Sequence, residues 1–146
     1  MDIDDGRRAV VRFLDGRVVK GITHDFAPNK TKFHLAPRGG ASVKPVEIEV
    51  ASLKGLFFVH SWEGDPKRVD DNTFDSAAGQ GRRVIVTFTD GETLAGFTMG
   101  YAADKLGFFV VPADPLSNNA RVFVVNGAVK KVEWVAGVHP AFKRVV

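Results

Sequence analysis

Basic side chains recur at corresponding places in the sequence and could bind an anion. Two Arg-Arg pairs, Arg7-Arg8 and Arg82-Arg83, lie 75 residues apart, and each opens an alternating apolar stretch. Guanidinium groups can bind phosphate or carboxylate through two parallel hydrogen bonds. Small β-barrels bind single strands of nucleic acid through basic grooves that also carry aromatic rings. The candidate anion-binding or nucleic-acid-binding residues are Arg7, Arg8, Arg12, Lys30, Lys32, Arg38, Arg82 and Arg83.

An alternative interpretation gives the same cations a structural role. Charged side chains along the edge strands of a sheet prevent pairing with other chains. The net charge is only +3, from 20 basic and 17 acidic residues. This composition permits binding to nucleic acid or another anion without requiring it, so both interpretations stay open.

The sequence carries no pattern that indicates an enzyme, a cofactor or a metal centre. It lacks the Gly-x-Ser-x-Gly nucleophile elbow, the P-loop and the dinucleotide-binding glycine motif. There are no cysteines, and the four histidines lack the i, i+4 spacing of a helical zinc site. His24-Asp25 could form an acid–base pair, but we favour a solvated strand end there. We therefore expect no catalytic residue, no cofactor and no metal.

The candidate cations belong to a stretch that occurs twice. It reads Arg-Arg-Ala-Val-Val-Arg-Phe-Leu-Asp-Gly over 7–16 and Arg-Arg-Val-Ile-Val-Thr-Phe-Thr-Asp-Gly over 82–91. Apolar residues alternate in both copies, which predicts a β-strand whose Phe-bearing face lies in the core. The offset of 75 persists from Phe33 to Phe108 and from Pro37 to Pro112. This persistence indicates an internal duplication.

Each alternating run ends in an Asp-Gly pair that predicts a hairpin. Such a pair is typical of the two-residue type I′ turn, in which both central residues have positive φ. A glycine also lies at the same place in each return strand, where it indicates a bulge or bend. A small barrel needs this bend where its long second strand passes from one sheet to the other. The predicted structural turn and bend residues are Asp15, Gly16, Gly21, Asp90, Gly91 and Gly96.

The period-two pattern predicts five strands in each copy and an all-β fold. We place them at 7–14, 17–26, 32–36, 46–50 and 53–59, and at 82–89, 92–101, 106–111, 121–125 and 129–135. One inserted residue changes the offset to 76 at the fifth strands. The predicted organisation is a first small barrel over 1–63, an acidic linker over 64–80 and a second small barrel over 81–146. Within the linker, Val69, Phe74 and Ala77 could form one apolar helical turn that packs on a barrel.

The first copy resembles the first Sm motif of Sm/Hfq-type RNA-binding proteins. The matching residues are Val11, Phe13, Asp15-Gly16-Arg17, Gly21 and Phe26-Ala27-Pro28-Asn29. The motif and both copies share a spacing of five residues from turn glycine to strand glycine, and five more to the aromatic residue. The positions that contact RNA in the family do not match, with Ala27 and Ala102 in place of Asp, and Ala51-Ser52 and Asn126-Gly127 in place of an Arg-Gly or Lys-His pair. The resemblance implies a pair of SH3-like or Sm-like barrels more strongly than it implies RNA binding.

The duplicated pattern is also similar to uncharacterised bacterial modules associated with PilZ-type signalling proteins. PilZ domains bind a cyclic dinucleotide through Arg-x-x-x-Arg and a downstream Asp/Asn-x-Ser-x-x-Gly motif. Arg8-Ala-Val-Val-Arg12 has the spacing of the first motif. Asp75-Ser76-Ala-Ala-Gly79 has the residue types of the second in the wrong spacing, and Thr87 stands where the second copy would need the second Arg.

Our leading hypothesis is a non-catalytic binding or adaptor module of a bacterial regulatory system. Its loops at 38–44 and 113–119 differ between the copies, so they and the barrel edges are suited to recruit another protein. The first alternative is an Sm-like protein that binds RNA or single-stranded DNA, and the second is a PilZ-like receptor for a cyclic dinucleotide. The oligomeric state stays open between a pseudo-dimer within one chain and a homo-oligomer.

The expected location is the cytoplasm. No apolar run approaches the roughly 20 residues of a membrane helix, so we expect no membrane partner. The acidic start Met-Asp-Ile-Asp-Asp has no apolar segment typical of a secretory signal.

Overall fold

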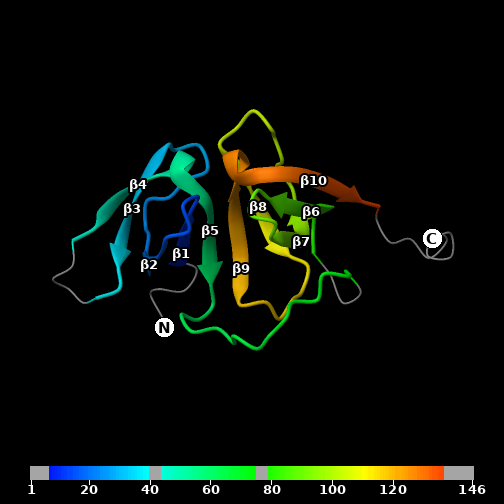
Figure 1. The fold of residues 1–146 in the computed structure, drawn as a ribbon, viewed down its shortest axis with the longest axis horizontal. Coiled ribbons are helices and arrows are strands. Elements are labelled where there is room, and N and C mark those ends of the chain that lie inside the picture. The colour runs from blue at the N-terminus through cyan, green and yellow to red at the C-terminus, as the bar shows by residue number, and fades with distance from the viewer. Residues whose placement is uncertain (1–6, 40–43, 75–78, 137–146) are drawn as a thin grey trace.

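The computed structural model describes residues 7–39, 44–74 and 79–136, and this part of the chain is all-β, as predicted (Figure 1). The first five strands are β1 (Arg8–Phe13), β2 (Val18–Ile22), β3 (Lys32–Pro37), β4 (Val46–Glu49) and β5 (Leu53–Val59). The second five are β6 (Arg82–Phe88), β7 (Thr93–Thr98), β8 (Gly107–Pro112), β9 (Asn119–Val125) and β10 (Val129–Val135). Short 3₁₀ helices, η1 (Val50–Ser52) and η2 (Asn126–Ala128), precede β5 and β10. No helix in these ranges is long and apolar enough to cross a membrane.

The ten strands form one antiparallel sheet in the order β10-β6-β7-β8-β9-β5-β1-β2-β3-β4. Within each half the order is the same: fifth, first, second, third and fourth strand. The sheet does not close, because β10 and β4 remain at its two ends. The all-β class is confirmed, and all ten strands belong to one open sheet, while the organisation into two tandem five-stranded barrels stays a prediction.

The halves are joined by β5 and β9, which lie side by side at the centre of Figure 1 and pair from Gly55↔Val124 onward. Both strands are apolar on both faces. Leu56 and Phe58 point into the first core, while Phe57 and Val59 belong to the second. From β9, Phe123 lies in the first core and Val122 in the second. Each core therefore contains side chains of both halves, and burial on both faces explains the nearly continuous apolar sequence of the two strands.

The hairpin turns differ from the predicted type I′. Only Gly16 and Gly91 have positive φ, at 94° and 92°, and the aspartates before them do not. The Gly16 N–H donates to the Phe13 carbonyl and the Phe13 N–H to the Arg17 carbonyl, and the same pattern recurs from Phe88 to Glu92. This is a type I turn followed by a left-handed glycine that forms a bulge. The type I′ prediction was wrong, and the real loop has three residues instead of two.

The strand glycines mark bends, as predicted. β2 pairs with β1 along its whole length, but with β3 only at Gly21↔Pro37 and Ile22↔Ala36. The second half repeats this geometry at Gly96↔Pro112. At both glycines the neighbouring strand approaches so closely that a Cβ atom would overlap its backbone carbonyl.

The residue inserted in the second half lies earlier than predicted. Phe33 pairs with Ile48, and Phe108 pairs with Val124, so the offset already reaches 76 at the fourth strands. The insertion therefore lies in the loop before β9.

The described residues between β5 and β6 contain no helix or strand. Phe74 packs into a third apolar cluster with Ala95, Phe97 and Ala113, whereas Val69 is 88% exposed. Ala77 lies outside the described residues. The predicted docking of Phe74 is thus present without a helical turn.

Candidate functional site

Four cations of the first half lie on one face of its sheet, and we call Arg8, Arg12, Lys20 and Arg38 the basic face. Arg8 and Arg12 alternate with buried Ala9 and Val11 on β1, so they point away from the first core. Lys20 of β2 pairs with Val10, which lies between the two arginines on the same side. The Arg38 N–H donates to the Lys20 carbonyl over 3.0 Å, which brings Arg38 beside Lys20.

Backbone and aromatic contacts hold the basic face in position around Trp62. The Arg38 guanidinium lies 4.8 Å from the centroid of the Trp62 ring, and the Lys20 ammonium donates to the Trp62 carbonyl over 3.0 Å. Arg12 lies 5.3 Å from the centroid of the Phe57 ring. Such cation–π contacts orient a guanidinium without neutralising its charge.

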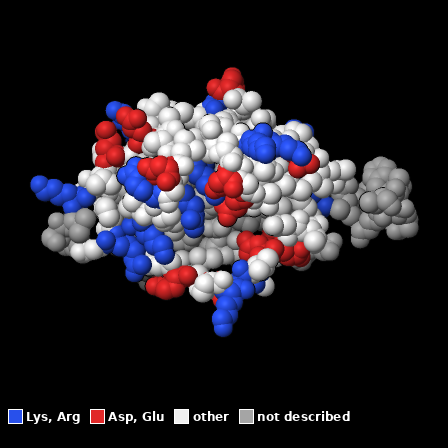
Figure 2. Space-filling view, in the orientation of Figure 1, with Lys and Arg blue, Asp and Glu red and all other residues white. Residues whose placement is uncertain are grey.

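Three of the four cations of the basic face have no ion-pair partner within the described part of the chain. Arg12, Lys20 and Arg38 are exposed, and none of them forms an ion pair with an acidic residue of the described ranges. Figure 2 shows Lys and Arg side chains gathered over the half that contains β1 to β5, with acidic side chains beside them. These three cations are therefore available to an anionic partner.

A cleft of about 660 Å³ borders the basic face, between the first half, the 62–72 segment and the β6–β7 turn. Arg12, Lys20 and Trp62 line its first side. Glu63 and Asp65 also line it and form its acidic wall, together with Asp70, Arg68 and apolar side chains such as Phe57 and Leu94. A cleft lined by both cations and carboxylates suits a ligand that carries both acidic groups and hydrogen-bond donors.

Five of the eight predicted cations lie elsewhere. Lys30 forms an ion pair with Asp25 at 3.7 Å, and Lys32 lies 3.6 Å from Glu47 and 3.9 Å from Glu49. Arg82 stacks on Trp134, with its guanidinium 3.7 Å from the ring centroid. Arg7 is exposed just before β1, and Arg83 lies over the rings of Phe74 and Phe97. Only Arg8, Arg12 and Arg38 of the predicted set come together.

Sequence reasoning missed Lys20 and Trp62. With a two-residue Asp-Gly turn, Lys20 would lie opposite Val11 and point into the first core. The three-residue loop shifts the hairpin register by one residue, and a shift of one moves a side chain to the other face of the sheet. A correct turn type would thus have identified Lys20. No sequence signal would have identified Trp62, which follows β5 and reaches the basic face through tertiary packing.

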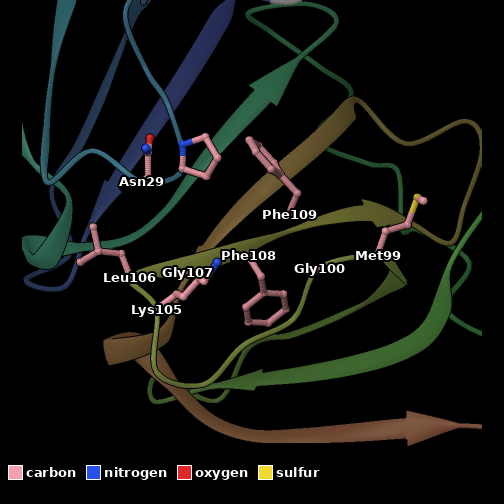
Figure 3. A pocket seen from close by; sticks show the side chains of 9 residues that line it. Asn29, Met99, Gly100, Lys105, Leu106, Gly107, Phe108 and Phe109 are labelled. Carbon is pink, nitrogen blue, oxygen red and sulfur yellow. The ribbon is translucent and has the colours of Figure 1, made fainter.

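A second cavity, also of about 660 Å³, lies between the 28–29 turn and β8 (Figure 3). Its lining is mostly apolar, with Pro28, Leu106 and Phe109 among the wall residues and Met99 at one end. Phe109 and Phe108 point to opposite sides of β8. Lys105 is the sole titratable side chain among the lining residues. This cavity can accept an apolar group, but it has few polar groups to orient one.

The sequence pair His24-Asp25 is not the pair that forms. The Asp25 carboxylate instead accepts the His34 backbone N–H at 2.9 Å and lies 2.8 Å from the His34 ring nitrogen Nδ1. His34 is more than half exposed, and no hydroxyl lies on its other ring nitrogen, which instead faces Glu47 at 3.9 Å. In the described residues no group of three metal-ligating side chains occurs. The Asp25–His34 pair is thus a structural contact of the β2–β3 connection.

Asp25 should make folding stability sensitive to acid. Burial by itself would raise its pKa, but the His34 backbone N–H, the His34 ring and Lys30 outweigh burial and lower the pKa to about 2. A carboxyl with a lowered folded pKa stabilises the fold above its unfolded pKa of about 4, and this contribution is lost as the pH falls toward 2. Because the side chain is partly exposed, we expect less than about 1 kcal/mol. Asp25→Asn should flatten the dependence of Tm on pH between about 4 and 2, and an unchanged slope would contradict this assignment.

The chain matches the model of a family of unknown function (DUF6982) over residues 5–136. No curated protein matches the chain, and no solved structure matches it either.

Proposed function

The chain belongs to a family of unknown function, DUF6982, and from its own geometry we propose that it is a non-catalytic binding module that holds an anionic partner on its basic face. The observation that carries this proposal is that Lys20 and Arg38 contact Trp62, and Arg12 the Phe57 ring of the same cleft, without a neutralising carboxylate among the described residues. Clustered cations beside a cleft raise the local concentration of anions and orient them on arrival.

The side chains at the basic face suit binding and not bond cleavage. Guanidinium and ammonium groups donate hydrogen bonds and attract negative charge, and the aromatic rings offer apolar contact area. A nucleophile with a base beside it is the usual requirement for covalent catalysis, and the hydroxyls in the lining of this cleft, those of Thr93 and Ser117, form no hydrogen bond with a base among the described residues. We further propose that the module acts as an adaptor in a bacterial regulatory system.

The strand order supports a further part of the proposal, that the chain is a duplicated small-barrel module of SH3-like or Sm-like type. Both halves run fifth, first, second, third and fourth strand, with the same turns and the same bends. The fourth strand of the second unit pairs with the fifth strand of the first. In this view the two units share strand edges within one chain as a pseudo-dimer.

A second candidate function is binding of single-stranded nucleic acid. The placement of Trp62 between Arg38 and Lys20 favours it, because proteins of this kind combine base stacking on aromatic rings with cations along the backbone. This candidate predicts affinity that falls steeply with salt through counterion release.

The proposal is tested with the triple variant Arg12→Ala/Lys20→Ala/Arg38→Ala. We expect it to lose at least about tenfold in affinity for labelled polyglutamate or polyuridylate near 50 mM salt, where charge contacts are strongest. The control Lys105→Ala/Lys130→Ala/Lys131→Ala removes the same charge at exposed positions outside the basic face. Binding that weakens equally in both variants, or no binding of either polymer to the native chain, would refute the proposal.

A further inference from the structure

The second half carries a face that corresponds to the basic face but has fewer cations, and Phe74 of the same chain packs on it. At the positions that correspond to Arg8, Arg12, Lys20 and Arg38, it has Arg83, Thr87, Ala95 and Ala113. The correspondence is geometric as well, because the Ala113 N–H donates to the Ala95 carbonyl over 2.9 Å, as the Arg38 N–H does to Lys20. Equivalent faces thus differ in charge while keeping the same backbone.

Phe74 occupies this second face at the end of an acidic segment without helix or strand, and its own backbone is left-handed, with φ at 66°. Its ring is buried against Ala95 and Ala113, and it meets the Phe97 ring edge-on at a centroid distance of 5.6 Å. The Arg83 guanidinium lies 5.4 Å from the Phe74 ring centroid. The residues before it include Asp70 and Asp71, and the Asp71 backbone N–H is held by the buried carboxylate of Asp114. The chain thereby displays how such a face takes up an aromatic residue within an acidic peptide.

The basic face also offers apolar contact area for an aromatic side chain, and it carries more positive charge than the second face. Where the second face has Ala95 and Ala113 around the aromatic ring, the first has Lys20 and Arg38. Val10 and Phe57 form an apolar floor, but both belong to the second core and are only 5% and 7% exposed, so the partly buried Trp62 ring offers the apolar contact in the cleft. Trp62 covers part of this floor, and the cleft lies beside it. A fitting occupant therefore has an aromatic side chain for the floor and carboxylates for the cations.

The acidic wall of the cleft favours a peptide over a nucleic acid. Glu63 and Asp65 face the same cleft as Arg12 and Lys20. A phosphate backbone carries a charge at every nucleotide, so part of it would meet these carboxylates. A peptide can place its carboxylates on the cations and its backbone N–H groups toward the acidic wall. Only a ligand of mixed polarity can match both the cations and the carboxylates that line this cleft.

We infer that the basic face binds a peptide segment of a partner protein that combines several acidic residues with one aromatic residue. The inference rests on the proposed function and names its partner. The aromatic side chain enters the cleft beside Trp62, and the carboxylates contact Arg12, Lys20 and Arg38.

The test uses the full chain and fluorescein-labelled Glu-Asp-Asp-Phe-Asp-Glu, read by fluorescence anisotropy. Two matched probes accompany it, the same peptide with Ala in place of Phe and a hexamer of uridylate RNA. We expect the Phe peptide to bind at least about tenfold more tightly than either probe, because a buried aromatic anchor usually dominates such an interface. Lys20→Ala/Arg38→Ala, which gives the first face the residues of the second, should abolish this preference for the acidic peptide.

The outcomes separate the two proposals. RNA that binds while both peptides do not would overturn the inference and leave the proposed function standing. Equal binding of the Phe and Ala peptides would also overturn it, since charge alone would then be recognised. If no probe binds at low salt, both proposals fail. A Tm of each variant within a few degrees of the native value shows that lost binding does not reflect unfolding.

Discussion

Gly96→Ala is expected to lower the free energy of unfolding by about 3 kcal/mol, the upper part of the range for an overpacked interior. A Cβ atom at this position would overlap the Val111 carbonyl oxygen and lie 2.5 Å from Cγ1 of Val110. The obstacle is backbone of a paired strand, so relief requires β7 and β8 to separate where they begin to pair. Gly21→Ala should have a similar effect in the first half, because its Cβ would overlap the Ala36 carbonyl.

Gly100→Ala is the matched control. A Cβ atom there would meet no other atom within 4 Å, and we expect a change within about 0.5 kcal/mol. Urea unfolding followed by circular dichroism would compare the three variants. Equal stability of Gly96→Ala and Gly100→Ala would contradict the close strand approach that defines the bend.

Removing the negative charges of Asp90 and Glu92, which bind Lys54, should lower the free energy of unfolding by about 2 kcal/mol. Lys54 lies on β5 of the first half, and its side chain is only 11% exposed. Its ammonium donates to Asp90 over 2.7 Å and to Glu92, both in the β6–β7 turn of the second half. The hydrogen bond from Lys54 lowers the pKa of Asp90. In Asp90→Asn/Glu92→Gln the turn keeps its acceptors, but a mostly buried ammonium loses both counter-charges, and such a loss is costly.

A third substitution makes this prediction specific. Adding Lys54→Met to the double variant removes the unpaired charge and keeps an unbranched side chain beside the Phe88 ring. Replacement of a buried ion pair by apolar groups is often neutral, so the triple variant should regain most of the lost stability. A triple variant as unstable as the double one would show that the contact acts through the turn and not through charge.

The local elements were largely predictable from the amino-acid sequence. Alternation of apolar residues in stretches such as Ala9 to Phe13 placed the first strand of each half, because strand side chains alternate between two faces, and turn residues bounded the other strands. Gly21 and Gly96 marked the bends because only glycine fits where a neighbouring backbone approaches this closely. The Asp-Gly pairs marked the hairpins, but not whether two or three residues form each loop.

The arrangement of the strands and the binding face depended on contacts between distant residues. Strand β5 could pair with β4 and close a barrel within the first half, or it could pair with β9. Its sequence pattern would be the same in either case. The pairing with β9 buries Leu56 in one core and Phe57 in the other. Likewise Arg8 and Arg12 share a face by their spacing alone. Lys20 lies on the same face because the three-residue turn shifts the hairpin register by one residue. Arg38 and Trp62, which are 24 residues apart in the sequence, meet beside this face through tertiary packing.

The amino-acid sequence by itself determined the all-β class, the strands, their bends and the duplicated pattern. These features follow from side-chain periodicity and backbone conformation, which act over a few residues. The tertiary structure alone decided that the halves share one open sheet, that Phe74 occupies the second face, and that Arg12, Lys20 and Arg38, beside Phe57 and Trp62, leave the first face basic. These outcomes depend on which apolar surfaces bury one another. Alternative strand pairings have similar local energies, so only the packing of the whole chain selects one of them.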